Sequence, residues 1–176
     1  MKTPRSFVIR GIIWLCILSP VSIAIIPGER AEGTDVDTVV RLGARAQQAT
    51  EQPHAELQLL QLLNGLRGAN GLPALRMDAS LQGAAREHSH DMAVNGYVGH
   101  GTLGGQSVLE RLAPVVRRGY VGENVTIAQT IEDAERAFTA SQGHLHNMLN
   151  PVFHRVGIGI ADGSHMGLVV TEDFAE

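Results

Sequence analysis

The sequence predicts an α+β fold in which helices pack on an antiparallel sheet. Three observations support this prediction: helical periodicity in the first half of the chain, alternating apolar residues near its end, and hairpin links rather than crossovers there. The chain has 176 residues, 44% of them hydrophobic, which suffices for one globular core. No internal repeat is present.

Residues 1–24 have the order of a secretory signal peptide. Three basic residues in the first ten precede an apolar run over 11–18, and the small-residue site Ser22-Ile23-Ala24 follows. The apolar character continues only to Ile26, short of the roughly 20 residues that span a bilayer. We expect cleavage near Ala24 and no transmembrane span in the mature chain; an uncleaved membrane anchor is the alternative.

Charge and cysteine content exclude two classes of function. The formal net charge is −4, and loss of the leader leaves 11 basic against 18 acidic residues. A nucleic-acid-binding protein needs a basic face, so we exclude that class, and attraction to anionic lipid is disfavoured. Cys16 is the only cysteine, and its apolar flanks do not fit a lipoprotein site. The mature chain therefore has no disulfide and no thiol chemistry.

The domain is predicted over 53–176. Residues 25–52 are polar and weakly periodic, so we expect a linker with at most one short helix, from Asp35 to Ala46. After Pro53 a leucine stripe at helical spacing predicts an amphipathic helix that ends at Asn70-Gly71. The stripe consists of Leu59, Leu62, Leu63 and Leu66.

Capping and turn signals predict the next elements. Asp78 is a suitable N-cap for a helix that ends at Asn95, with Gly96 beyond it. The stretch 96–105 is glycine-rich and predicts a loop, and a short helix follows over 107–116. Alternation over 122–128 predicts a half-buried strand.

The last third of the sequence predicts a helix and a hairpin. Thr130 opens the helix, whose inner face runs to Ser141, and Gly143 is expected to break it. The hairpin runs from Val156 to Val170, and we expect its turn at Asp162-Gly163.

Histidine is the most unusual component of the sequence. Seven of the eight histidines fall between residues 88 and 165. His88 and His90 lie two apart on a predicted helix, so they cannot chelate one metal ion together. We expect His88 to be a core residue bonded to backbone, and His90 and Asp91 to face water.

His100, His144 and Glu123 are the candidates for chemistry. Both histidines occupy predicted loop edges, and Glu123 begins a strand where a carboxylate is unusual unless paired. Histidine with carboxylate can form a divalent-metal site or an acid–base pair. Spacing alone does not distinguish these from solvated surface histidines.

Five segments in order resemble the bacterial branch of the CAP superfamily, the SCP-like extracellular proteins. They are LLNGLRGANGLPALR, HSHDMAVNGYVGH, GENV, SQGHLHNMLNPVF and VGIGIAD, and the resemblance covers roughly residues 54–172. The resemblance implies an α-β-α sandwich around a central antiparallel sheet, one cavity, and a secreted, periplasmic or cell-envelope location.

The resemblance also implies the residues that line the cavity. The family's two histidines correspond to His100 and His144, and the first of up to two acidic residues corresponds to Glu123. Ser141 stands in the slot that holds glutamate in eukaryotic relatives, and Phe138 stands where many bacterial members have tryptophan. The chain thus departs from the family's four-residue site at the second acid.

Three functions remain open. The first is a binding module for a divalent ion, such as Zn²⁺ on His100 and His144, or for a small apolar or lipid ligand, or an envelope component. The second is metal-dependent, peptidase-like hydrolysis with Glu123 as base. The third is a ligand-free polar cluster that fixes the loops of an interaction domain. We expect binding rather than catalysis, and we expect Ser141 to cap a helix rather than to be a nucleophile.

Overall fold

The structure is a computed structural model that describes residues 36–176, without the side chains of 44–51. The expected signal peptide, Cys16 and the first part of the expected linker lie outside this range. The elements in chain order are α1 (Val36–Ala69), β1 (Arg76–Met77), α2 (Ala79–Asn95), α3 (Val108–Leu112), β2 (Val121–Ala128), α4 (Ile131–Ala140), α5 (Gln142–Met148), β3 (Arg155–Asp162), a 3-10 turn η1 (Ser164–Met166) and β4 (Leu168–Ala175).

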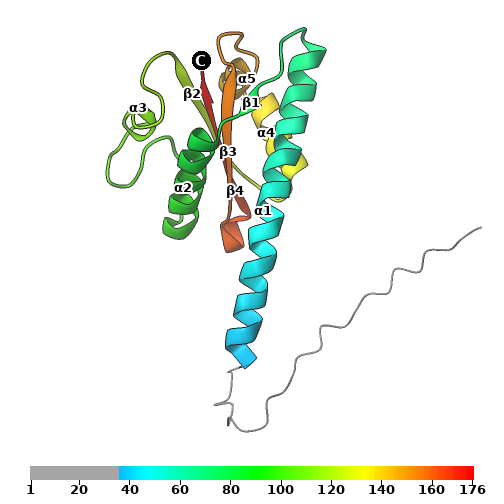
Figure 1. The fold of residues 1–176 in the computed structure, drawn as a ribbon, viewed down its shortest axis with the longest axis vertical. Helices are drawn as coiled ribbons and strands as arrows, with labels where there is room; N and C mark the ends of the chain where they lie inside the picture. Colours follow the sequence, from blue (N-terminus) through cyan, green and yellow to red (C-terminus); the bar gives the residue numbers. More distant parts are fainter. Residues whose placement is uncertain (1–35) are drawn as a thin grey trace, which may run out of the picture.

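A four-stranded sheet separates two helical layers. The strand order is β1-β3-β4-β2, and β4 pairs antiparallel with both β3 and β2. The two-residue β1 adds to β3 in parallel. Figure 1 shows α2 and α3 on one side of the sheet and α1 and α4 on the other. The expected α-β-α sandwich on a largely antiparallel sheet is confirmed.

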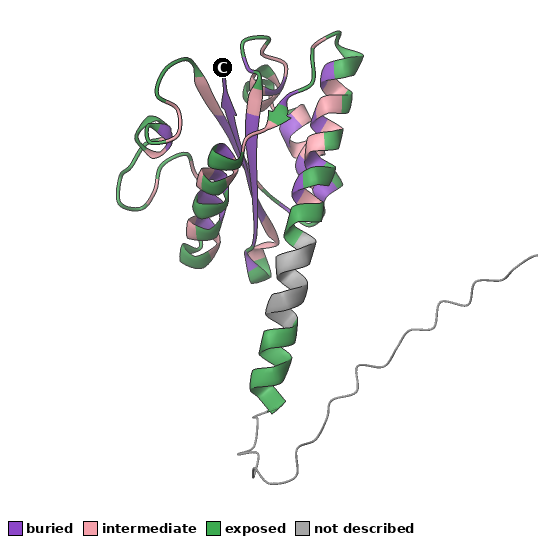
Figure 2. Cartoon of the chain, in the orientation of Figure 1, coloured by how far each residue is buried: buried purple, intermediate pink, exposed green. Residues whose placement is uncertain are grey.

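The larger core lies between the sheet and the layer that contains α1, α4 and α5. Leu59 of α1, Phe138 of α4 and Met148 of α5 are fully buried there against Ile158 and Phe174. On the other face two smaller clusters form around α2. Their buried members are Leu81, Leu112 and Ala175 in one and Met92, Val125 and Val169 in the other. Figure 2 shows the resulting burial along the strands.

Two glycines allow α2 to lie directly on β3. A Cβ at Gly157 would overlap the backbone of Leu81, and one at Gly159 would overlap the backbone of Ala85. Glycine at both positions therefore brings the helix axis closer to the sheet than any side chain permits. This close approach fixes the position of α2, which carries His88.

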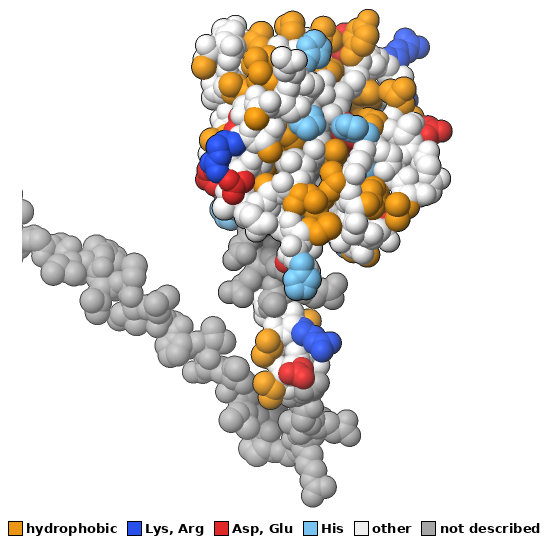
Figure 3. Space-filling view, turned by 180° about the vertical axis from the view of Figure 1, so that it is seen from behind, with side chains coloured by type: hydrophobic (Ala, Val, Ile, Leu, Met, Phe, Trp, Pro, Cys, Tyr) orange, Lys and Arg blue, Asp and Glu red, His pale blue; other side chains and the backbone are white. Residues whose placement is uncertain are grey.

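The α1 helix is longer than the sequence predicted. The described part of the expected linker is helical, and the helix passes through Pro53 without a break. Pro53 is exposed, so water can bond the carbonyl that the missing N–H leaves free. The first turns of α1 project beyond the sheet, and the described side chains there are all exposed (Figure 2). Figure 3 shows hydrophobic, acidic and basic side chains together on this projecting end.

Other predicted boundaries were correct or shifted for identifiable reasons. Asp78 caps α2 and Gly96, with φ of 68°, ends it. Gly143 does not break the helix, because Ser141 in extended conformation ends α4 and starts α5, and Gly143 lies inside α5. The β3–β4 connection is not a two-residue turn, since η1 extends it. Within residues 36–176 no helix combines the length and apolar character needed to cross a membrane.

Candidate functional site

The candidate site is built on β2, an edge strand with neighbouring polar residues on its two faces. Glu123 and Asn124 are 6% and 0% exposed, and successive side chains of a strand point to opposite faces. Glu123 therefore faces the α2–α3 layer, and Asn124 faces the layer with α4 and α5. Each residue pairs with a buried acid of β4, because the register sets Glu123 opposite Asp173 and Asn124 opposite Glu172.

Glu123 is the centre of a buried charge cluster. Its Oε2 accepts a hydrogen bond from Arg111 of α3, and its Oε1 lies 2.8 Å from Nδ1 of His100. The Arg111 guanidinium also reaches Asp173 Oδ2 at 3.5 Å. His88 Nε2 lies 3.8 Å from Glu123 Oε2 and donates to the carbonyl of Gly99 at 2.9 Å. The expectation that His88 is a core residue bonded to backbone is confirmed.

Two carboxylates in this cluster share one guanidinium. Burial raises the pKa of Glu123 to about 7, although Arg111 opposes the rise. Burial, and then the charge of Glu123, raise the pKa of Asp173 to about 8. Near neutral pH the pair therefore holds a proton. Burial also lowers the pKa of His88, which keeps that imidazole neutral.

His100 is the part of the cluster that reaches solvent. Its side chain is 57% exposed, whereas that of Glu123 is 1% exposed. Since Nδ1 donates to the Glu123 carboxylate, Nε2 carries the lone pair of the neutral imidazole. An open groove of about 380 Å³ begins beside this residue, with Val108 and Leu109 as its apolar wall. The cluster thus presents one oriented ring nitrogen next to a groove.

The opposite face of β2 carries a second buried network. Asn124 Nδ2 donates to Glu172 Oε2 at 3.0 Å and to the carbonyl of His144 at 3.3 Å. Asn147 Nδ2 donates to Asn124 Oδ1 and to the Glu123 carbonyl. Burial raises the pKa of Glu172 to about 8, and its Oε1 has no partner. This network holds α5, and with it His144, against the strand.

His144 approaches the site from this second face. Its ring packs edge-on against Phe138 at 5.3 Å, and its Nδ1 is buried without a hydrogen-bond partner. Burial lowers its pKa, and the charge of His100 lowers it further. The ring therefore stays neutral. No hydrogen bond joins it to Glu123 among the described residues, so the expected His–Glu–His cluster contains His100 and Glu123 but not the His144 ring.

Ser141 is a capping residue, as the sequence predicted. It is the N-cap of α5, and its Oγ accepts from the backbone N–H of His144. The second carboxylate beside Glu123 belongs to Asp173 and not to the Ser141 position. Sequence reasoning missed Arg111, Asp173 and Glu172. Glu172 and Asp173 could have been found from the apolar strand sequence VVTEDFA. A strand buried on both faces does not normally carry two adjacent acids.

The donor set limits which metal ions fit. No group of three or more His, Cys, Asp or Glu side chains in the described part of the chain is placed to hold one ion. Glu123 is already committed to Arg111. A tightly held Zn²⁺ takes three or four protein ligands, so such a site does not fit these residues. At most the imidazoles of His100 and His144 remain as ligands.

Comparison with known proteins identifies the family. The sequence profile described as CAP, the Cysteine-rich secretory protein family, matches residues 60–174. This protein belongs to the CAP family. The match spans all the elements that build the site, from the second half of α1 to β4.

Relatives of this CAP domain come from several bacteria. The uncharacterized protein YkwD of Bacillus subtilis is 31% identical over 121 residues, 68% of this chain and 46% of that protein. A Bacillus anthracis extracellular protein containing a SCP domain is 28% identical, with a TM-score of 0.65 over 71% of this chain and 41% of that one. An outer surface protein of Borrelia burgdorferi shares the fold at 17% identity, with a TM-score of 0.65 over 70% of this chain and 92% of that one.

The CAP domain spans less than half the length of the two Bacillus relatives. What the remainder of those proteins does is therefore a separate question from what this domain does. The solved structures support the fold and the extracellular type of the family.

Proposed function

We propose that this CAP domain is an extracellular binding module whose ligand contacts the imidazole of His100. The observation that carries the proposal is the bond of 2.8 Å between the buried Glu123 and Nδ1 of the exposed His100 ring. A carboxylate in this position fixes the tautomer and the orientation of an imidazole, and it leaves Nε2 for a ligand.

The groove beside His100 indicates the class of ligand. Its wall is apolar at Val108 and Leu109, and glycines 101 and 105 leave its other side open. A volume of about 380 Å³ accepts a small molecule or one end of a longer one. The matching ligand has a hydrogen-bond donor for the Nε2 lone pair and a short apolar part, as an alkyl alcohol has.

A divalent ion is the second candidate, favoured by the same carboxylate–imidazole pair. Glu123 would orient His100 through its Nδ1, while the imidazoles of His100 and the neutral His144 contact the ion. With two protein ligands the affinity is modest, and acidification lowers it because protons compete with the ion for an imidazole nitrogen.

Hydrolysis has less support from the geometry. The Ser141 hydroxyl accepts a helix N–H and lacks a base, and Glu123 is paired with Arg111 rather than free to activate water. We therefore propose binding and not catalysis. Export through a cleaved leader over residues 1–24 belongs to the same proposal, and the mass of the exported chain would test it by showing Ile25 at the N-terminus.

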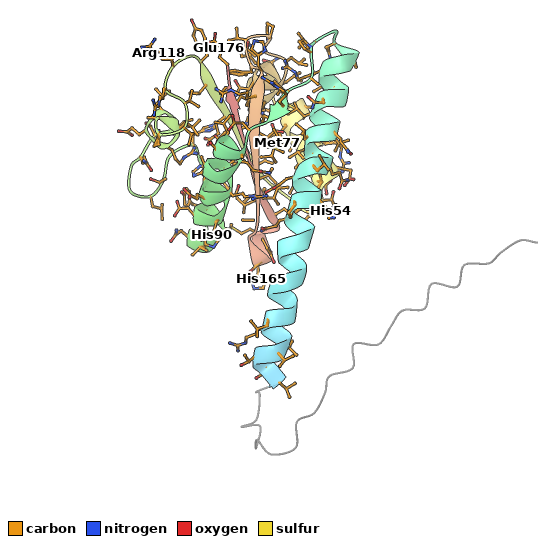
Figure 4. The ribbon with its side chains drawn as sticks, in the orientation of Figure 1. His54, Met77, His90, Arg118, His165 and Glu176 are labelled. Carbon is orange, nitrogen blue, oxygen red and sulfur yellow. The ribbon has the colours of Figure 1, made fainter. Side chains whose placement is uncertain are left out.

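The test is calorimetric titration of the full chain at pH 7.5 with 1-octanol and, separately, with Zn²⁺. His100→Ala and His144→Ala are the variants, and His165→Ala is the control because His165 is exposed at the opposite end of the domain (Figure 4). Binding of 1-octanol that His100→Ala abolishes and His165→Ala preserves supports the binding module. Zn²⁺ binding lost in both site variants supports the ion. If His100→Ala leaves the affinity for both probes unchanged, the proposal is wrong.

Glu123→Gln distinguishes binding from a purely structural cluster. If the cluster only fixes the loops, this variant lowers stability without changing any affinity. If Glu123 orients His100 for a ligand, affinity falls by more than stability does.

A further inference from the structure

In the described part of the chain, no strand pairs with the outer edge of β3 over more than half its length. β3 pairs with β4 along its whole length, but β1 covers the other edge only at Arg155 and Val156. The N–H of Asp78 donates to the Val156 carbonyl, and the N–H of Gly163 donates to the carbonyl of Gly167, the residue before β4. By alternation, Ile160 and Asp162 direct their backbone N–H and C=O groups away from β4, toward the uncovered edge.

Helices α1 and α2 enclose this edge from both sides. Glu56 of α1 is fully buried and bonds Gln82 at 2.8 Å and Arg86 at 2.7 Å on α2. Beyond this junction the helices leave a groove of about 570 Å³, lined by Gln52 and Ala55 of α1, His90 and Val94 of α2, and Ile160 and Asp162 of β3. A smaller hollow that shares Gln52, His90 and Ile160 continues it toward Glu87.

The groove differs in chemistry from the His100 site. Its small and apolar walls include Ala55, Ala93 and Val94, and the strand edge lies at its floor. Arg86 is neutralised by Glu56. The remaining charges are the exposed carboxylates of Glu87 and Asp162, and no ion pair is formed by either among the described residues. The rim is therefore acidic.

We propose that this groove binds an extended peptide with basic side chains, which adds to β3 as a further strand. A strand supplies N–H and C=O groups at the spacing that Ile160 and Asp162 present, and its side chains point alternately to the two walls. Lysine or arginine on the peptide complements Glu87 and Asp162. The enclosing helices also prevent flat edge-to-edge association of two sheets, which an open edge would invite.

Fluorescence anisotropy with the full chain tests the proposal. The probe is a fluorescein-labelled peptide, Lys-Val-Lys-Val-Lys, and a second probe carries N-methyl groups on both valines. Strand addition predicts saturable binding of the first and about tenfold weaker binding of the second, since N-methylation removes two main-chain donors and leaves the charge unchanged. Equal binding of the two probes would overturn strand addition.

Variants locate the binding site. Val94 is 68% exposed, so Val94→Arg is expected to fold and to weaken binding about tenfold by placing a cation in the groove. Leu103→Arg, at an equally exposed position outside the groove, is the control. The double variant Glu87→Gln/Asp162→Asn should also weaken binding of the lysine peptide, because it removes both carboxylates of the rim.

Amide exchange gives the most direct evidence. The bound peptide should slow exchange of the Ile160 and Asp162 amides, which face the groove, relative to the free protein. Absence of binding, unchanged affinity in Val94→Arg, or protection elsewhere but not at these two amides would each refute the proposal.

Discussion

Replacement of Glu172 by glutamine should stabilise the protein in a pH-dependent way. Glu172 is fully buried, one carboxylate oxygen accepts from Asn124 at 3.0 Å, and the other has no partner. Glutamine keeps the shape and one oxygen acceptor for Asn124. It removes a carboxyl group whose pKa is raised by burial from 4.5 to about 8.

The magnitude follows from the proton that this carboxyl group retains on folding. Below about pH 4 both states are protonated and burial of Glu172 has no electrostatic cost. As the pH rises from 4.5 toward 8, the unfolded state ionises while the folded state stays protonated, so stability falls. The cost is about 1 kcal/mol at pH 5 and about 3 kcal/mol at pH 7. The advantage of Glu172→Gln should therefore grow by ~2 kcal/mol between these pH values.

Urea denaturation at pH 5, 6 and 7 measures this difference. Far-UV circular dichroism is the suitable signal, because the single tryptophan, Trp14, lies outside the described residues. Glu87→Gln is the matched control, since Glu87 is exposed and its variant should show no pH-dependent difference from wild type. A constant difference between Glu172→Gln and wild type from pH 5 to 7 would mean that Glu172 is ionised in the folded protein, contrary to the argument.

Three further substitutions test other parts of the structure. Gly159→Ala should destabilise the protein by ~3 kcal/mol or more in urea denaturation, because its Cβ would overlap α2, whereas Gly65→Ala, with open space around it on α1, should be neutral or stabilising by ~0.5 kcal/mol. Arg111→Met should lower the free energy of unfolding by ~3 kcal/mol at pH 8 and by less at pH 5, where the carboxyls it contacts are protonated; an equal loss at both pH values would argue against the shared proton. Ser141→Ala should cost ~1 kcal/mol of stability and leave the affinity for 1-octanol unchanged, and a lost affinity would refute a purely capping role.

Local signals in the sequence were sufficient for most helices and for the two strands of the hairpin, but not for its turn. Asp78 caps the start of α2 and Gly96 ends it, and Ser107 begins α3 with a capping box. The length of α1 could not be predicted in the same way. Weakly periodic polar residues are equally compatible with a linker and with a solvent-exposed helix. Pro53 suggested a helix boundary, but at its exposed position it does not end the helix.

The residues of the site also fall into two groups, those that local sequence context predicts and those that it does not. His100 and Glu123 could be proposed because each is an unusual residue for its local context. Arg111 and Asp173 could not, since their importance arises from the β2–β4 register and the docking of α3, which are tertiary properties. A guanidinium on a short helix resembles any surface arginine until the strand opposite it is known.

The projecting part of α1 also sets a distance. A helix rises 1.5 Å per residue, so Val36 lies about 25 Å along the axis from Gln52, where the helix meets the groove. The described part of α1 therefore separates Val36 from the groove as a rod of that length. The helix acts as a spacer between Val36 and the groove between α1 and α2.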